Sequence, residues 1–252
     1  MEEKEKLRQI YNEISPFCAP LLFLPTRDAQ ATHVLNNATM SLIDTGQKRI
    51  FVTCYHVWSS YKKKKDENKN LILALGTGDN SPTILLDDLR ILDGNEKCLD
   101  LAILTFKNED LYPTGKKKFY RPENWPLSPP DEGELVAFYG FPGEYRSPHP
   151  VQDGILSRGM LFVDCVTAVN DDYIFSVDTS GIREQKIYEV GLQWLRSFGG
   201  VSGSPVFVNR NMRFELIGFV CEAWGSKGEF LRISRADFIT PDGTLDYTRI
   251  AR

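Results

Sequence analysis

The chain has 252 residues, a formal net charge of −4 at pH 7, and 42% hydrophobic and 12% aromatic residues. That content can bury a sizeable core in one or two compact units, and the negative charge argues against nucleic-acid binding as the main function. The longest apolar runs, such as Ala19–Leu24, are far shorter than the ~20 residues of a membrane span, so we expect no membrane association.

The N-terminus and the cysteines favour a cytoplasmic protein. Met1–Gln9 is charged at nearly every position and lacks the apolar core and cleavage site of a signal peptide. The five cysteines are an odd number without paired spacing, and a leftover thiol needs no partner in a reducing cytosol. The cysteines and histidines also form no ligand-spaced cluster, so we predict neither a metal nor an organic cofactor.

The first half of the chain predicts a helix followed by strands. Glu2–Ile14 carries apolar residues at three- and four-residue spacing, which indicates a short amphipathic helix that ends at Ser15-Pro16. A turn at Thr45-Gly46-Gln47, a short helical turn over Cys54–Tyr61 and a polar surface loop over Lys62–Lys69 are expected. The expected strands are Ala19–Leu24, Thr39–Asp44, Lys48–Thr53, Leu71–Leu75, Thr83–Leu86 and Leu101–Phe106.

The second half predicts strands again, after a connector of about 107–133 in which prolines cluster. The expected strands are Glu134–Tyr139, Gly159–Thr167, Tyr173–Val177, Pro205–Asn209, Leu216–Cys221 and Gly228–Ile233. Many short strands in two halves indicate an all-β double barrel. We place the N-terminal helix at about 2–14, the first barrel at about 17–106 and the second at about 134–239.

A serine-containing turn is the first chemical signal. Ser202 lies among glycines in Phe198–Phe207, a run that ends at Pro205 and then becomes apolar. Glycine allows a tight, exposed backbone, and attack by a serine needs backbone N–H groups aimed at the oxyanion that forms. If Ser202 attacks, its own N–H and that of Gly200 can supply these donors.

Two further segments strengthen this interpretation. His56 directly follows a strand-like run, and Asp100 lies in the otherwise apolar segment Cys98–Phe106. A buried carboxylate needs a partner, and an imidazole N–H is a fitting one. The order along the chain is therefore His56, Asp100 and Ser202.

Together these segments resemble the trypsin/chymotrypsin-like serine peptidases. Thr53-Cys54-Tyr55-His56 is similar to the family's Thr-Ala-Ala-His, and Asp100-Leu101-Ala102-Ile103 to Asp-Ile-Ala-Leu. Gly200-Val201-Ser202-Gly203-Ser204-Pro205 is similar to Gly-Asp-Ser-Gly-Gly-Pro. The resemblance implies one peptidase domain over 1–252, built from two six-stranded β-barrels of chymotrypsin-like fold with the site in the cleft between them.

The resemblance also implies a serine endopeptidase that acts on a protein or peptide substrate through an acyl-enzyme. His56 would be the base, Asp100 would orient its imidazole and Ser202 would be the nucleophile. The N–H groups of Gly200 and Ser202 would form the oxyanion hole.

Rival residues fit less well. His33 lies in a polar stretch and His149 between two prolines. Ser204, if chosen as nucleophile, would be followed at once by Pro205, so Ser202 is preferred.

The chain departs from the family's pattern at two places, and these indicate which members of the family it resembles most. Val201 stands where many secreted members carry an aspartate that pairs with a newly cut N-terminus, and a valine cannot form that ion pair. Intracellular, HtrA-type relatives also lack the aspartate, although fewer than fifteen residues follow Ile239, too few for an appended peptide-binding domain. For the specificity pocket the resemblance implies the neighbourhood of Arg196 and the segment Cys221, Glu222 and Ala223. Arg196 would favour an acidic substrate side chain if it points inward, and the alternative is that it points to solvent, as surface arginines usually do.

Two alternatives stay open. The chain is either a pseudoprotease that keeps the fold as a regulatory or binding module, or a protease that stays inactive until a protein partner orders its loops. Gly199-Gly200 would allow the peptide flip that such gating needs, and a bacterial stress or defence system would supply the partner.

Overall fold

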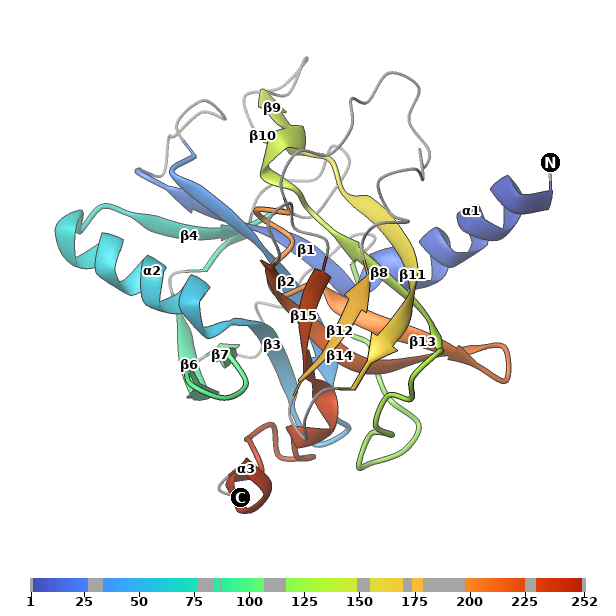
Figure 1. Cartoon of the computed structure of the whole chain (residues 1–252). Coiled ribbons are helices and arrows are strands. Elements are labelled where there is room, and N and C mark those ends of the chain that lie inside the picture. The colour runs from blue at the N-terminus through green and yellow to red at the C-terminus, as the bar shows by residue number, and fades with distance from the viewer. Residues whose placement is uncertain are drawn as a thin grey trace.

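The computed structural model describes residues 2–26, 34–76, 84–86, 88–106, 117–148, 155–169, 174–178, 198–224 and 230–250. Within these ranges most of the ordered backbone is β-strand, arranged in two large antiparallel sheets with few helices (Figure 1). Strands formed early in the chain belong to one sheet and later strands to the other, as expected for two strand-rich halves.

The first sheet has seven strands in the order β5-β4-β1-β2-β3-β7-β6. Their bounds are β1 Cys18–Leu24, β2 Asn36–Asp44, β3 Arg49–Cys54, β4 Ile72–Leu75, β5 Ile84–Leu85, β6 Leu89–Asn95 and β7 Leu101–Phe106. The expectation of six strands is wrong for this half because β6 was missed. Its sequence contains Asp93, Gly94 and Asn95, residue types that are depleted in strands, and it forms by pairing with β7.

The second sheet is a closed barrel of six strands in the order β11-β12-β15-β14-β13-β8. Their bounds are β8 Leu135–Gly140, β11 Met160–Ala168, β12 Ile174–Asp178, β13 Pro205–Arg210, β14 Arg213–Trp224 and β15 Phe230–Arg235. Alternate residues of these strands fill its interior, among them Phe138 and Phe162, whose rings stack with centroids 4.6 Å apart. A short pair, β9 Arg146–Pro148 and β10 Ile155–Ser157, stands apart from the barrel.

The helices lie outside the sheets, with α1 and α2 on opposite sides of the molecule (Figure 1). The helix α1, Glu2–Ile14, has the expected bounds, and Ile14 is fully buried at its end. The helix α2, Tyr55–Glu67, is longer than expected, so the loop predicted over Lys62–Lys69 is wrong. Lysine is a good helix former and only Val57 of this helix is buried, so its lysines can face water.

Smaller helical segments complete the chain: η1 Ser15–Phe17, η3 Gly143–Tyr145, η5 Ala236–Phe238 and α3 Tyr247–Ile250. No helix in the described ranges has both the length and the apolar character that crossing a membrane requires.

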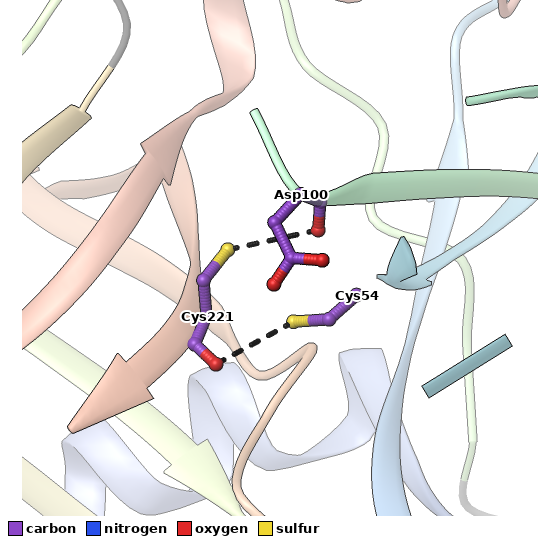
Figure 2. Close-up of side chains that lie close together, drawn as sticks. All are labelled: Cys54, Asp100 and Cys221. Carbon is purple, nitrogen blue, oxygen red and sulfur yellow. Dashed lines mark hydrogen bonds between the residues drawn. The ribbon is translucent and has the colours of Figure 1, made fainter. Parts of the chain in front are cut away.

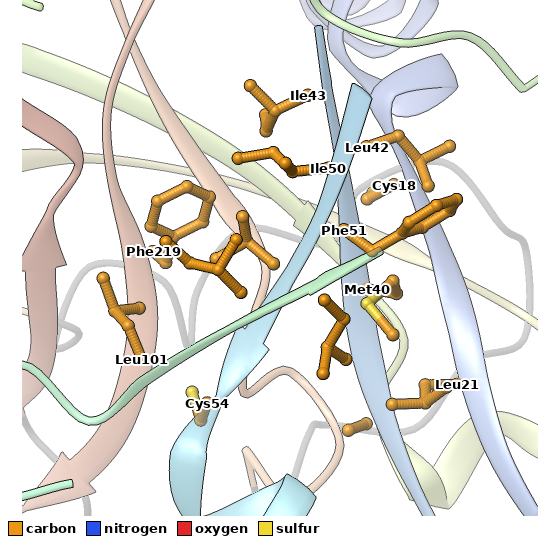
Figure 3. Packing of buried hydrophobic residues seen from close by; sticks show 14 of the residues in the cluster. Cys18, Leu21, Met40, Leu42, Ile43, Ile50, Phe51, Cys54, Leu101 and Phe219 are labelled. Atoms are coloured by element: carbon orange, nitrogen blue, oxygen red, sulfur yellow. The ribbon is translucent and has the colours of Figure 1, made fainter. Parts of the chain in front are cut away.

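The largest hydrophobic cluster joins the two sheets. It contains Phe51 and Leu101 of the first sheet together with Phe219 of the barrel strand β14 (Figure 3). Phe51 is fully buried, and its ring meets those of Phe106 and Phe119 edge-on at 4.9 and 5.4 Å. Because one core serves both sheets, packing fixes how the sheets lie against each other.

Phe51→Ala should therefore lower the free energy of unfolding by about 3–5 kcal/mol, since it leaves a cavity in this shared core. Urea denaturation followed by tryptophan fluorescence measures the change. Leu135→Ala is the matched control, because Leu135 is 53% exposed and should change stability by less than about 0.5 kcal/mol. A loss at Phe51 no larger than the control would contradict the shared core.

Candidate active site

Strand pairing brings His56 and Asp100 together. Cys54, the last residue of β3, pairs with Leu101, the first residue of β7. His56 lies just beyond the end of β3, and Asp100 just before the start of β7. Two residues that are 44 positions apart in sequence therefore meet at the same end of two neighbouring strands.

His56 makes two contacts to the Asp100 carboxylate, one through its imidazole and one through its backbone. Nδ1 lies 2.6 Å from Oδ2, and the backbone N–H of His56 donates to Oδ1 at 2.9 Å. Asp100 itself adopts a left-handed backbone conformation, with φ of +49°. That conformation is costly for a residue with a side chain, and it aims this carboxylate at the ring.

The electrostatics suit a base with one open nitrogen. The Asp100 side chain is 14% exposed and that of His56 is 52% exposed. A carboxylate only accepts hydrogen bonds, so Nδ1 carries the proton and Nε2 keeps its lone pair. The hydrogen bond to Asp100 raises the pKa of His56; partial burial opposes that rise, and the charges of Asp100 and Glu222 add to it.

Ser202 lies in the turn before β13 and shares a cleft of about 620 Å³ with His56 and Asp100. Its hydroxyl donates to the backbone carbonyl of Cys221 at 3.2 Å. In the described part of the chain, no hydrogen bond joins Ser202 to His56. Rotation about the single Cα–Cβ bond of Ser202 changes which acceptor its hydroxyl meets.

Ser204 does not offer a rival hydroxyl. Its side chain is fully buried, and its Oγ donates to the carbonyl of Val201 at 2.6 Å. This hydroxyl therefore stabilises the turn from within.

Two glycines give the turn its shape. Gly200 has φ of +99° and Gly203 has φ of +90°. A Cβ atom at Gly200 would lie 2.6 Å from the carbonyl oxygen of Phe141, and one at Gly203 would lie 2.2 Å from that of Thr39. Both positions therefore exclude larger residues by backbone conformation and by space.

The backbone donors of the turn fall into two groups. The N–H groups of Val201, Gly203 and Ser204 donate to the carbonyls of Phe198, Val220 and Val201. The N–H groups of Gly200 and Ser202 have no acceptor among the described residues. These two are the donors that an oxyanion beside Ser202 would need.

The peptide between Gly199 and Gly200 is held in place. The carbonyl of Gly199 accepts the N–H of Gly143 at 2.8 Å. Since a trans peptide directs its C=O and N–H to opposite sides, the N–H of Gly200 points away from Gly143. A flip of this peptide would break the bond to Gly143.

Polar groups of strand β2 bind the turn from the first sheet. The backbone N–H of Thr39 donates to the carbonyl of Ser202 at 2.9 Å, and its hydroxyl donates to that of Gly200 at 2.9 Å. The Ser41 hydroxyl donates to the carbonyl of Gly203 at 2.6 Å. Sequence reasoning missed Thr39 and Ser41, although hydroxyls at alternate positions of an otherwise apolar strand are a usable signal.

Two thiols lie behind Asp100. Figure 2 shows Cys54 from β3, Cys221 from β14 and the Asp100 side chain turned towards them. One ligand atom from each residue lies within 4.8 Å of the others, a tertiary cluster that the sequence spacing does not reveal. Metal binding would require deprotonated thiols, whereas burial strongly raises the pKa of Cys54 and His56 already occupies the Asp100 carboxylate. The cluster therefore suits neutral thiols that donate to backbone carbonyls, as Cys54 does to Val220 at 3.1 Å.

Some of the other residues predicted from the sequence lie at the cleft, and others lie in the core or outside the described residues. Cys221, Glu222 and Ala223 lie on β14 and line the same cleft, with Cys221 buried and the other two exposed. Val201 is 1% exposed and packs into the barrel core. Arg196 lies outside the described residues, as do His33 and His149, and all five cysteines are free thiols.

Comparisons with known proteins bear on the fold. Neither a protein-family model nor a curated protein matches the chain. Among solved structures, it is similar to a serine endoprotease from Yersinia pestis, with a TM-score of 0.54 and 14% identity. That match covers 91% of this chain but only 62% of the Yersinia chain, so this chain spans less than two thirds of that protein's length.

Two further structures agree with it. The chain is similar to human heparin binding protein, with a TM-score of 0.54 and 14% identity, covering 88% of this chain and 86% of that one. It is also similar to the thermostable serine protease AL20 from an extremophilic microorganism, with a TM-score of 0.51 and 10% identity, covering 88% and 91%. At these identities the likeness shows the fold alone: two curled antiparallel sheets arranged as in chymotrypsin-like proteins.

Thr39→Val should destabilise the protein by about 1–3 kcal/mol, because the buried carbonyl of Gly200 and the N–H of Phe141 both lose their partner. Thermal and urea unfolding measure the loss. Thr167→Val is the control, since that threonine is exposed and its hydroxyl bond is long, at 3.5 Å. Equal stability of the two variants would show that Thr39 does not support the turn.

The pKa of His56 should lie above the ordinary histidine value of about 6.5 and fall on Asp100→Asn, which removes the carboxylate that raises it. Titration of the imidazole C–H signals by NMR measures both values, and His56→Gln assigns the resonance. A raised folded pKa stabilises the fold most at pH below about 6.5, and that contribution is lost as pH rises through the folded pKa. An unchanged titration in Asp100→Asn would refute the assigned interaction.

Proposed function

We propose that the chain is a serine endopeptidase that hydrolyses peptide bonds through His56, Asp100 and Ser202. The observation that carries the proposal is the 2.6 Å bond between His56 Nδ1 and Asp100, in a cleft that Ser202 also lines. That contact fixes the imidazole tautomer with an open Nε2, which is the state a base requires.

The proposed reaction starts when Ser202 rotates its hydroxyl from the Cys221 carbonyl towards His56. Oγ attacks the substrate carbonyl carbon while Nε2 takes its proton, and the resulting oxyanion accepts from the N–H groups of Gly200 and Ser202. The imidazolium then protonates the leaving amine, and the peptide bond breaks to leave an acyl-enzyme. Water, deprotonated by His56, releases the acid and restores Ser202.

The substrate chain would extend along β14. Glu222 and Ala223 are exposed there beside Cys221, and all three line the cleft. An extended peptide can pair with such a segment through backbone hydrogen bonds. We also keep Arg196 as a proposed pocket residue on the resemblance alone.

The geometry supports a preformed oxyanion site over a partner-gated one. The Gly143 N–H holds the carbonyl of Gly199, and the Thr39 hydroxyl holds that of Gly200. A pseudoprotease that keeps only the fold is also not favoured, because the His56–Asp100 contact serves no evident structural need, and neither do the N–H groups of Gly200 and Ser202, which have no acceptor in the described ranges. An HtrA-type relationship and a cytoplasmic location stay predictions, as do protein or peptide substrates and the absence of a role in binding nucleic acid.

A fluorophosphonate probe should label Ser202 covalently, and the chain alone should cleave short unstructured peptides without a lag. Ser202→Ala should abolish labelling and reduce turnover by about four orders of magnitude or more. Activity should rise with pH through a midpoint above about 6.5, because the base must be neutral and its pKa is raised. Intact-protein mass spectrometry and peptide kinetics measure these outcomes.

Ser204→Ala is the control for labelling. The probe should still label this variant, because the Ser204 hydroxyl that it lacks is fully buried in the wild type and out of the probe's reach. Loss of labelling in Ser204→Ala with retention in Ser202→Ala would overturn the assignment. Turnover that starts only after a partner protein is added would favour the gated alternative, and a wild type that neither labels nor cleaves would favour the pseudoprotease.

A further inference from the structure

Arg232 faces the same cleft from strand β15. Leu231 and Ile233 point into the barrel core, so the alternation of a strand places Arg232 and Ser234 on the opposite side. Ser234 Oγ lies 3.0 Å from Cys221 Sγ, directly behind the proposed catalytic residues. Arg232 lines the cleft together with Ser202 and His56.

The guanidinium of Arg232 is incompletely satisfied. Its Nε atom is buried and has no hydrogen-bond partner within the described part of the chain. Its Nη1 atom lies 3.6 Å from Glu222 Oε2, a distance of charge attraction without a good hydrogen bond. A buried donor without an acceptor is costly, so this site favours a ligand that brings an acceptor to Nε.

The other charged residues of the cleft do not supply the acceptor that Arg232 Nε lacks. Asp100 is bound to His56, and Glu96 and Lys97 contribute one charge of each sign. The Glu222 side chain is 62% exposed, against 31% for Arg232. Ion pairs with so exposed a partner are weak, so Glu222 can give way to a competing carboxylate.

We propose that Arg232 binds the carboxylate of an acidic substrate side chain, on the residue whose carbonyl Ser202 attacks. A guanidinium matches a carboxylate through two parallel N–H donors, and such a pair would satisfy Nε. The proposal rests on the proposed peptidase function and names its substrate class. It is independent of Arg196, for which the sequence suggested the same preference.

The test uses the full chain and dye-labelled peptides that differ only at this position, with Glu, Asp, Gln, Ala or Lys. The wild type should cleave the Glu and Asp peptides with at least tenfold higher kcat/KM than the Gln peptide. Arg232→Gln should reduce kcat/KM for the Glu peptide about 10- to 100-fold and leave the Gln peptide within about threefold. Arg232→Glu should favour the Lys peptide, and Glu222→Gln should strengthen the preference for Glu.

Arg213→Gln is the matched control, because Arg213 is an exposed arginine paired with Glu123 and absent from the cleft lining. It should leave the preference unchanged. Cleavage by the wild type without an acidic preference, or a preference that survives Arg232→Gln, would overturn the proposal while the peptidase function stands.

A binding measurement separates the two proposals. Ser202→Ala cannot form the acyl-enzyme, so fluorescence anisotropy reports its affinity for the same intact peptides. It should bind the Glu peptide at least tenfold more tightly than the Gln peptide, and Arg232→Gln in this background should remove the difference. If the wild type cleaves nothing, the peptidase function fails, and this comparison alone upholds or refutes the carboxylate site.

Discussion

The hydrogen bonds from strand β2 to the Ser202 turn are the constraint on which the site depends. The turn belongs to the barrel, yet Thr39 and Ser41 of the first sheet bind three of its carbonyls. Both side chains are fully buried, so these bonds form away from water, where an unpaired carbonyl is expensive. The position of Ser202 relative to His56 is therefore set by groups outside the proposed triad.

The packing of the two sheets also sets where the His56–Asp100 pair lies relative to Ser202. The core shared by the two sheets includes Phe51 and Phe219. His56 follows the end of β3, and Asp100 precedes the start of the neighbouring strand β7. Since Ser202 lies in the turn before the barrel strand β13, a change in how the two sheets pack would change its distance from the imidazole. Buried thiols at Cys54 and Cys221 lie behind Asp100, whose side chain is 14% exposed.

Local sequence patterns predicted the elements whose structure depends mainly on residues that are close together in the sequence. Helix α1 followed from apolar spacing, and the turn at Thr45-Gly46-Gln47 from its glycine, while β6 was missed because its residues become a strand only by pairing with β7. In the site, three short motifs were sufficient to select His56, Asp100 and Ser202, which the fold brings to one cleft. Thr39 and Arg232 escaped notice because their partners lie far away in sequence and only the tertiary structure brings them together.

Because the Ser202 turn depends on hydrogen bonds from β2, the order in which the chain is synthesised affects when the site forms. Chains are made from the N-terminus onward, and early segments can fold first, so the segments that contain His56 and Asp100 leave the ribosome well before Ser202. Until the barrel strands follow and dock, the carbonyls around Ser202 lack their donors on β2, and the imidazole faces no hydroxyl. Under the proposed function, a growing chain would therefore carry the His56–Asp100 pair without Ser202 beside it, and the order of translation would delay the proposed reaction until both sheets are in contact.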